Sequence, residues 1–138
     1  MCVVTPPAEL SLPMDERAAG TARSFLAEAH CETHGAWVLD DAKLLVSELV
    51  TNAVCHGAPP VVLEIGCDGT TGMTVRVRDG DAHSPTLVQA TTEDESGRGV
   101  SLVDMISDDW GIEPAQHGKV IWFRLGARPA SPSPRSVD

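Results

Sequence analysis

The chain has 138 residues and a formal net charge of −10, and 42% of its residues are hydrophobic. This length suits one domain, and the apolar fraction is large enough for a core and too large for a disordered chain. Only ten lysines and arginines are scattered among 20 acidic residues. Nucleic-acid binding needs clustered cations, so direct binding to DNA or RNA is excluded.

Neither a membrane span nor a secretory signal is visible. No apolar run approaches the roughly 20 residues of a spanning helix. The N-terminal stretch MCVVTPPAEL lacks a basic segment followed by an apolar one. We therefore expect a cytoplasmic protein.

The four cysteines form no CxxC pair, and without a secretion signal a disulfide framework is not expected. His30 and His34 flank Cys31 at a spacing compatible with a helix. Because no second ligand pair follows elsewhere in the chain, we interpret this stretch as a helix end with incidental polar groups, not as a metal site.

Two helices are predicted in the first half of the chain. Residues 1–14 hold three prolines and should form an irregular arm or a short edge strand. From Asp15, apolar residues recur every three or four positions, which predicts a helix ending before Gly35. A second helix is predicted from Asp40 to His56, followed by a glycine and two prolines that stop it.

The period then changes to that of strands. Residues 61–65 are predicted to form one strand, and residues 73–78 alternate between apolar and polar side chains, as in a strand with one buried face. The turn-forming residues 68–72 lie between them. A β-hairpin is therefore expected.

A long loop is predicted over residues 81–98, which show little periodicity. A third helix should follow over residues 100–108. Residues 110–113 and 119–125 should form a final strand pair, and the tail from residue 126, rich in proline and serine, is expected to be disordered.

This order of elements predicts an α+β fold. Helices would cover one face of a largely antiparallel sheet, which gives a two-layer α/β sandwich. The domain would span residues 15–125, between an arm of residues 1–14 and a tail of residues 126–138.

A row of polar groups marks the second helix. Residues 48–57 read ELVTNAVCHG and place Glu48, Asn52 and His56 four positions apart. On a helical wheel, Glu48 and Asn52 lie roughly opposite the predicted core stripe of Ala42, Val46, Leu49, Val50 and Ala53. Such a row most often faces water. Here the row is surrounded by the apolar side chains of Leu44, Leu45, Val54 and Cys55. Apolar walls around a few polar groups are typical of a ligand pocket.

Two glycine-containing motifs support the pocket interpretation. Asp79 and Gly80 follow a predicted strand, where a carboxylate can accept a hydrogen bond from a ligand amine. Gly97, Arg98 and Gly99 precede a predicted helix. The two glycines let the backbone approach a ligand closely, and the free N–H groups at the start of the helix favour an anion such as phosphate. The loop between the two motifs could act as a lid.

In their joint order these motifs resemble a known family. Residues 48–57 resemble the N-box of the GHKL ATP-binding fold, residues 75–80 (VRVRDG) its G1 box, and residues 97–103 (GRGVSLV) its G2 box. The resemblance covers about residues 15–125 and is strongest to the anti-sigma-factor serine kinases, including stand-alone actinobacterial versions. It implies the two-layer sandwich known as the Bergerat fold.

The resemblance also implies roles for single residues. Asn52 would bind Mg²⁺, an ion that prefers oxygen ligands, and so hold the triphosphate of ATP. Glu48 would be the catalytic base that takes a proton from a serine hydroxyl or a water. Asp79, beside Gly80, would accept a hydrogen bond from the adenine amine. The phosphates would be approached by Gly97, Arg98 and Gly99.

Three functions remain open. The first is an anti-sigma factor and serine kinase that binds a sigma factor and phosphorylates a STAS-domain anti-anti-sigma partner, with a homodimer formed through the arm and first helix. The second is a non-catalytic binding module, because the G1 box lacks its second glycine and residues 93–95 (EDE) make the loop acidic. An ATPase or a fragment of a histidine kinase ranks last, because the resemblance in fold is its only support and a fold does not by itself define a function.

Overall fold

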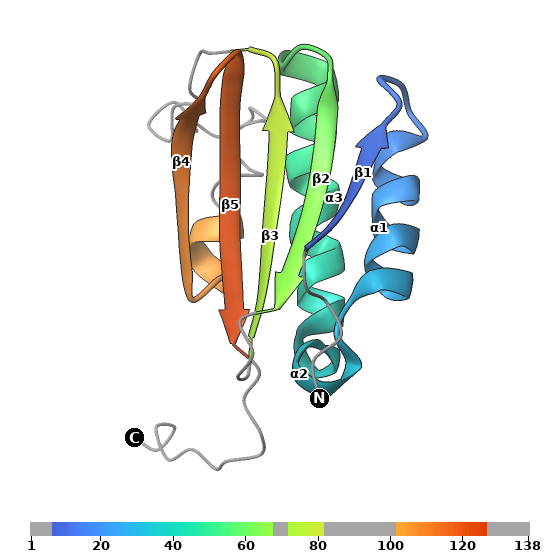
Figure 1. Cartoon of the computed structure of the whole chain (residues 1–138), viewed down its shortest axis with the longest axis vertical. Coiled ribbons are helices and arrows are strands. Elements are labelled where there is room, and N and C mark those ends of the chain that lie inside the picture. The colour runs from blue at the N-terminus through green and yellow to red at the C-terminus, as the bar shows by residue number, and fades with distance from the viewer. Residues whose placement is uncertain (1–6, 68–71, 82–101, 127–138) are drawn as a thin grey trace.

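The chain folds into one five-stranded sheet with helices on one side, as a computed structural model shows for residues 7–67, 72–81 and 102–126 (Figure 1). The sheet order is β1-β2-β3-β5-β4, and each of its four pairings is antiparallel. The elements in chain order are β1 (Ala8–Leu12), α1 (Ala18–Ala29), α2 (Glu32–Gly35), a 3-10 turn (Ala36–Val38), α3 (Leu39–His56), β2 (Val61–Cys67), β3 (Gly72–Asp79), β4 (Asp109–Ala115) and β5 (Gly118–Gly126).

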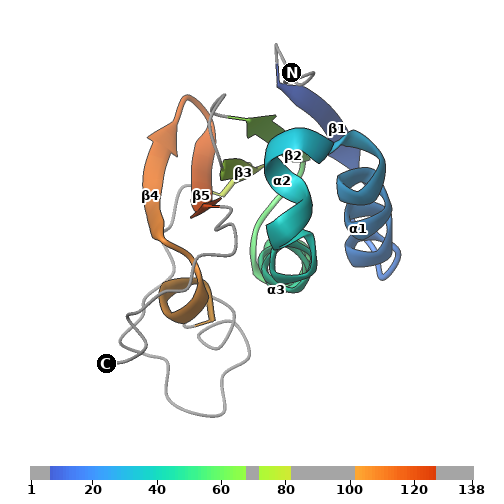
Figure 2. The same cartoon turned by 90° about the horizontal axis from the view of Figure 1, so that it is seen from below.

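The predicted two-layer α/β sandwich is confirmed. Seen along the strands, α1, α2 and α3 lie together on one face of the sheet, and a short helix over residues 102–106 lies on the same side (Figure 2). Among the described residues, the buried core between the layers is aliphatic apart from Cys31, Met73 and the fully buried Phe123. A sheet with one covered face needs helices on that side only, which is the two-layer arrangement.

Helix α3 forms where the sequence predicts it, and its predicted core stripe is buried. One expectation about its other face is wrong. The sequence pattern predicts Leu45 beside the polar row, yet it is fully buried, whereas Leu44 is 42% exposed. At 100° per residue Leu45 falls beside Leu49, so the buried stripe is wider than predicted.

The first predicted helix is shorter than expected. It begins at Ala18 and ends at Ala29, and residues 32–38 form α2 and the 3-10 turn instead. The start is delayed because Asp15 makes a local turn, accepting hydrogen bonds from the backbone N–H of Arg17 at 2.8 Å and from its guanidinium. The guanidinium holds the pKa of the Asp15 carboxyl below its usual value.

Both predicted strand pairs are present, β2 with β3 and β4 with β5. Of the two alternatives for the N-terminal segment, β1 is the short edge strand, paired with β2. The loop expected at 81–98 lies outside the described residues except for Asp81, as does most of the turn at 68–72. The tail was expected from residue 126, but Gly126 is the last residue of β5, and the rest of the tail lies outside the described residues. Among the described helices, none is both long and apolar enough to cross a membrane.

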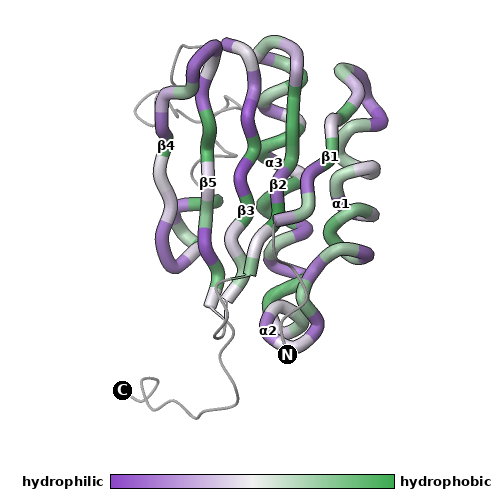
Figure 3. The backbone as a smooth tube through the Cα atoms, viewed as in Figure 1, coloured by the Kyte–Doolittle hydropathy of each residue, from purple (hydrophilic) through white to green (hydrophobic). Residues whose placement is uncertain are grey.

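Along β3, buried apolar residues that face the helices alternate with more exposed polar residues on the outer face, and the tube in Figure 3 shows the matching alternation of hydropathy. The outer face carries ion pairs of Arg76 with Glu64 and Glu113, and of Arg78 with Glu9, all partly exposed. Such pairs stabilise a fold little. With a period of two residues, the helix-facing row of β3 continues from Val75 through Val77 to Asp79, and that of β2 ends at Cys67. The carboxylate of Asp79 and the thiol of Cys67 thus lie on the side of the sheet that the helices cover.

Candidate functional site

Asp79 lies at the carboxyl end of β3 on the helix-facing side of the sheet, and it is only 4% exposed. It is directly opposite Lys119 in the antiparallel register of β3 and β5. Lys119 is also buried, at 7% exposure. Because burying a single charge is costly, the two opposite charges are expected to be retained as a pair.

Hydrogen bonds fix the Asp79 carboxylate. The Lys119 ammonium lies 3.2 Å from each carboxylate oxygen and donates to the carbonyl oxygen of Asp81 at 3.0 Å. The backbone N–H of Asp81 donates to Asp79 Oδ1 at 2.7 Å. An ionised carboxylate offers about four lone-pair sites, so these contacts leave about one for a further donor.

Three glycines allow the backbone to close around Asp79. A Cβ at Gly57 would lie 2.7 Å from Asp79 Cγ, a Cβ at Gly80 would collide with the carbonyl oxygen of Pro59, and one at Gly118 with that of Asp79. The N–H of Gly80 donates to the carbonyl oxygen of Ala58 at 2.7 Å. The end of β3 is therefore packed directly against the C-terminal end of α3.

Asn52 and Glu48 lie on this same helix, one turn apart, and both are partly buried. The side-chain oxygen of Asn52 is a buried atom that has no hydrogen-bond partner among the described residues. Nearly all buried polar atoms in proteins have a hydrogen-bond partner, so the Asn52 oxygen is expected to bind a hydrogen-bond donor or a cation. No ion pair or hydrogen bond to Glu48 is found among the described residues.

The structure thus brings together part of the predicted site. It places Asp79 and Gly80 at the end of the helix that carries Glu48 and Asn52. His56 and Cys55, in the last turn of α3, are exposed. The glycine-rich motif of Gly97, Arg98 and Gly99 lies outside the described residues. Lys119 was missed by the sequence analysis, because only the register of β3 and β5 places it against Asp79.

The fold and the site define a class of protein. A one-sided antiparallel sheet with a polar row on its central helix and a buried carboxylate at the adjoining strand end is the arrangement expected of a GHKL nucleotide-binding domain. The family model described as "Histidine kinase-like ATPase domain" matches residues 12–125. The chain belongs to this family of ATPase domains.

Solved structures with the same fold are distant in sequence. The chain is similar to the crystal structure of the RsbU and RsbW domains of Rv1364c from Mycobacterium tuberculosis, with a TM-score of 0.66 and 21% identity over 91% of this chain and 34% of that one. This chain thus spans about a third of the length of the chain in that structure. It is also similar to the histidine kinase domain of the blue-light activated histidine kinase EL346 from Erythrobacter litoralis, with a TM-score of 0.53 and 19% identity over 80% of this chain and 59% of that one. Among curated proteins none matches this chain.

Proposed function

We propose that the chain binds ATP with Mg²⁺ and acts as a protein serine/threonine kinase and anti-sigma factor. Its substrate would be a small STAS-domain anti-anti-sigma protein, and its regulatory target a sigma factor. Two findings support the proposal: membership of the ATPase family and likeness in fold to a structure that contains an RsbW domain. The observation that carries it is the buried, unpartnered oxygen of Asn52.

The residues of α3 fit a magnesium ion. Asn52 supplies the amide oxygen, and Mg²⁺ needs few protein ligands because it retains several waters. When bound, Mg²⁺ would neutralise phosphate charge. Glu48, one turn earlier on the same helix, would accept the proton of the partner's hydroxyl group. Asp79, next to Gly80, would accept a hydrogen bond from the adenine amine at its remaining lone pair, while Gly97, Arg98 and Gly99 would approach the phosphates.

The same proposal includes a cellular location, a homodimer and a charged contact with the sigma factor. The domain of residues 15–125 would act in the cytoplasm. The N-terminal arm and α1 would form the contact of a homodimer. The acidic charge of the chain, −10, would suit a basic surface on a sigma factor.

Replacing Asn52 by Ala should weaken the binding of Mg-ATP by roughly 10–100-fold, the loss typical when a group that supports a bound metal is removed. Binding should be measured by calorimetric titration of ATP with and without Mg²⁺. Thr51→Ala is the matched control, because Thr51 is exposed on the same helix. Wild-type protein that binds no ATP at millimolar Mg²⁺ would overturn the proposal.

Replacing Glu48 by Ala should retain ATP binding and slow phosphotransfer by about 10²–10⁴-fold, because a positioned base contributes this much. Transfer from radiolabelled ATP to a panel of STAS-domain proteins measures it, again with Thr51→Ala as the control. If the Glu48→Ala protein phosphorylates a partner as fast as the wild type, Glu48 is not the base.

One observation favours the second candidate, a binding module without catalysis. Lys119 already engages both oxygens of Asp79, the residue that should accept the adenine amine. If that ion pair keeps adenine out, the protein would act through contact with its partners alone. Absence of ATP binding together with retained binding to a sigma factor would support this alternative.

A further inference from the structure

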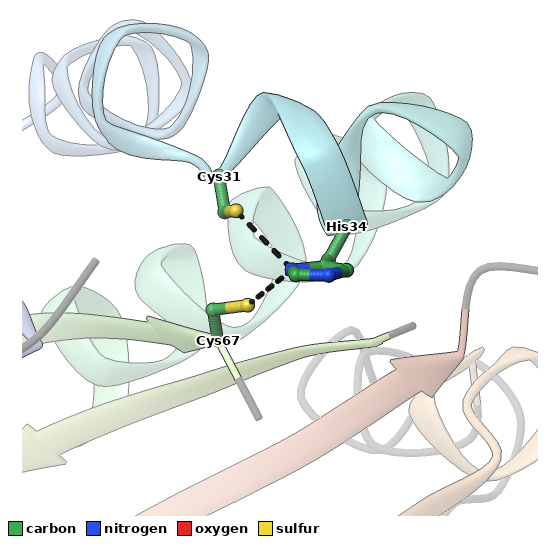
Figure 4. A group of neighbouring side chains, drawn as sticks. All are labelled: Cys31, His34 and Cys67. Carbon is green, nitrogen blue, oxygen red and sulfur yellow. Dashed lines mark hydrogen bonds between the residues drawn. The ribbon is translucent and has the colours of Figure 1, made fainter. Parts of the chain in front are cut away.

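A second cluster of reactive side chains lies at the other end of the sheet from Asp79. Cys31 is the N-cap residue of α2, His34 lies within α2, and Cys67 is the last residue of β2. Figure 4 shows the two sulfur atoms and the imidazole ring pointing toward one another. All three ligand atoms lie within 4.8 Å of one another. From the sequence, Cys31 and His34 are not expected to bind a metal, because no second ligand pair follows; the structure brings in a single third residue, Cys67, which is 33 residues beyond His34.

Local structure explains why these side chains converge. Cys31 caps α2 in an extended conformation, and its carbonyl oxygen accepts the N–H of His34 at 3.2 Å. This turn places the Cys31 and His34 side chains on one side of α2. Gly35 is buried over the strand ends, where a Cβ would come within 3.0 Å of Met73 Cε. Met73 pairs with Cys67, so the close approach at Gly35 brings α2 down onto Cys67.

The distances match those between the ligands of a tetrahedral metal. The Nδ1 atom of His34 lies 3.5 Å from Cys31 Sγ and 3.2 Å from Cys67 Sγ. A zinc ion would hold its sulfur and nitrogen ligands about 3.6 Å apart, given bond lengths of about 2.3 Å and 2.0–2.1 Å. Small side-chain rotations would therefore be enough to form the bonds.

The Nδ1 atom of His34 faces the sulfur atoms of Cys31 and Cys67 at once. One imidazole nitrogen carries either one proton or one lone pair. A cation at the centre would engage all three atoms at once. Cys31 is 3% exposed, and His34 and Cys67 are partly buried, so such an ion would be shielded from competing water.

We propose that Cys31, His34 and Cys67 form a zinc site with one open coordination position. Two thiolates and an imidazole are ligands that select zinc over magnesium or calcium. On binding, each thiol loses its proton to solvent and the two thiolates balance the charge of Zn²⁺. The ion would tie α2, and with it the entry to α3, to the end of β2.

Cobalt(II) gives a direct test with the full-length chain. Reduced, metal-stripped protein is titrated with Co²⁺ alone. We expect intense visible ligand-field bands and a near-ultraviolet thiolate-to-cobalt band that saturate at one ion per chain and disappear when one equivalent of Zn²⁺ is added. Zn²⁺ should also raise the melting temperature.

Matched variants decide which residues bind the ion. Cys67→Ser and His34→Gln should weaken metal binding by at least about 10-fold and remove the rise in melting temperature. Cys55→Ser and His30→Gln are the controls, because Cys55 is exposed on α3 and the His30 ring faces the carbonyl oxygens of Leu26 and Ala27. Circular dichroism of each metal-free variant checks that the fold is retained.

Three results would overturn the site. The first is a wild-type protein that shows no thiolate-to-cobalt band. The second is a Cys67→Ser protein that binds Co²⁺ as tightly as the wild type. The third is a metal-free protein in which mass spectrometry finds a disulfide between Cys31 and Cys67 that persists in reductant, so that the two sulfur atoms cannot bind a metal.

Discussion

Replacing Lys119 by Met is expected to lower the free energy of unfolding by roughly 3–5 kcal/mol, the cost of leaving a buried partner charge unpaired. Asp79 would lose the ammonium that lies 3.2 Å from both of its oxygens, and at 4% exposure it has little access to water. Of its hydrogen bonds within the described part of the chain, the one from the N–H of Asp81 would remain. Urea denaturation followed by circular dichroism measures the change.

A second substitution separates the charge from the packing. In Asp79→Asn/Lys119→Met neither charge is buried, so most of the lost stability should return, because replacing both members of a buried pair is often nearly neutral. Arg76→Met is the matched control on the outer face, where exposed ion pairs contribute about 0–1 kcal/mol. If the double variant is as unstable as Lys119→Met alone, packing of the lysine stem, and not the ion pair, is what stabilises this end of the sheet.

The parts of the fold that could be predicted are those with a strong local period. Helix α3 was expected with nearly its observed bounds, because its apolar residues repeat every three or four positions over 18 residues. The strand β3 was expected because Val75 and Val77 alternate with Thr74, Arg76 and Arg78. The 3-10 turn was missed and α2 was predicted as the end of the first helix, since residues 32–38 are too few to show a period of their own.

The contacts of the sites depend on tertiary structure and could not be predicted. Asp79 and Lys119 are 40 residues apart and meet only through the register of β3 and β5. Likewise, Cys67 meets His34 only because α2 packs over the ends of β2 and β3. The polar row of Glu48 and Asn52 could be predicted, because both residues lie on one helix. The buried, unpartnered state of the Asn52 oxygen could not, because it depends on what covers the helix.

Replacing Gly118 by Ala is expected to destabilise the protein by about 1–3 kcal/mol or more, because an inserted methyl group has no room. Gly118 is the first residue of β5, next to Lys119, and its Cβ would collide with the carbonyl oxygen of Asp79 and lie 2.8 Å from the Cα of Gly80. Both neighbours are backbone atoms, so no side-chain rotation can relieve the contact. The strands must separate at the point where Lys119 meets Asp79.

The matched control for Gly118→Ala is Gly20→Ala, which should have the opposite sign. Gly20 lies within α1, and the nearest atom to a Cβ there is Arg23 Nη2 at 3.6 Å, an ordinary contact with a flexible side chain. Ala in a helix is favoured over Gly by roughly 0.5–1 kcal/mol, so this variant should unfold at higher urea. If both alanine variants gain stability, β3 and β5 do not approach at Gly118 as closely as described. If only Gly118→Ala loses stability, and its folded form binds ATP more weakly, the close approach that holds Asp79 in place also supports the proposed nucleotide site.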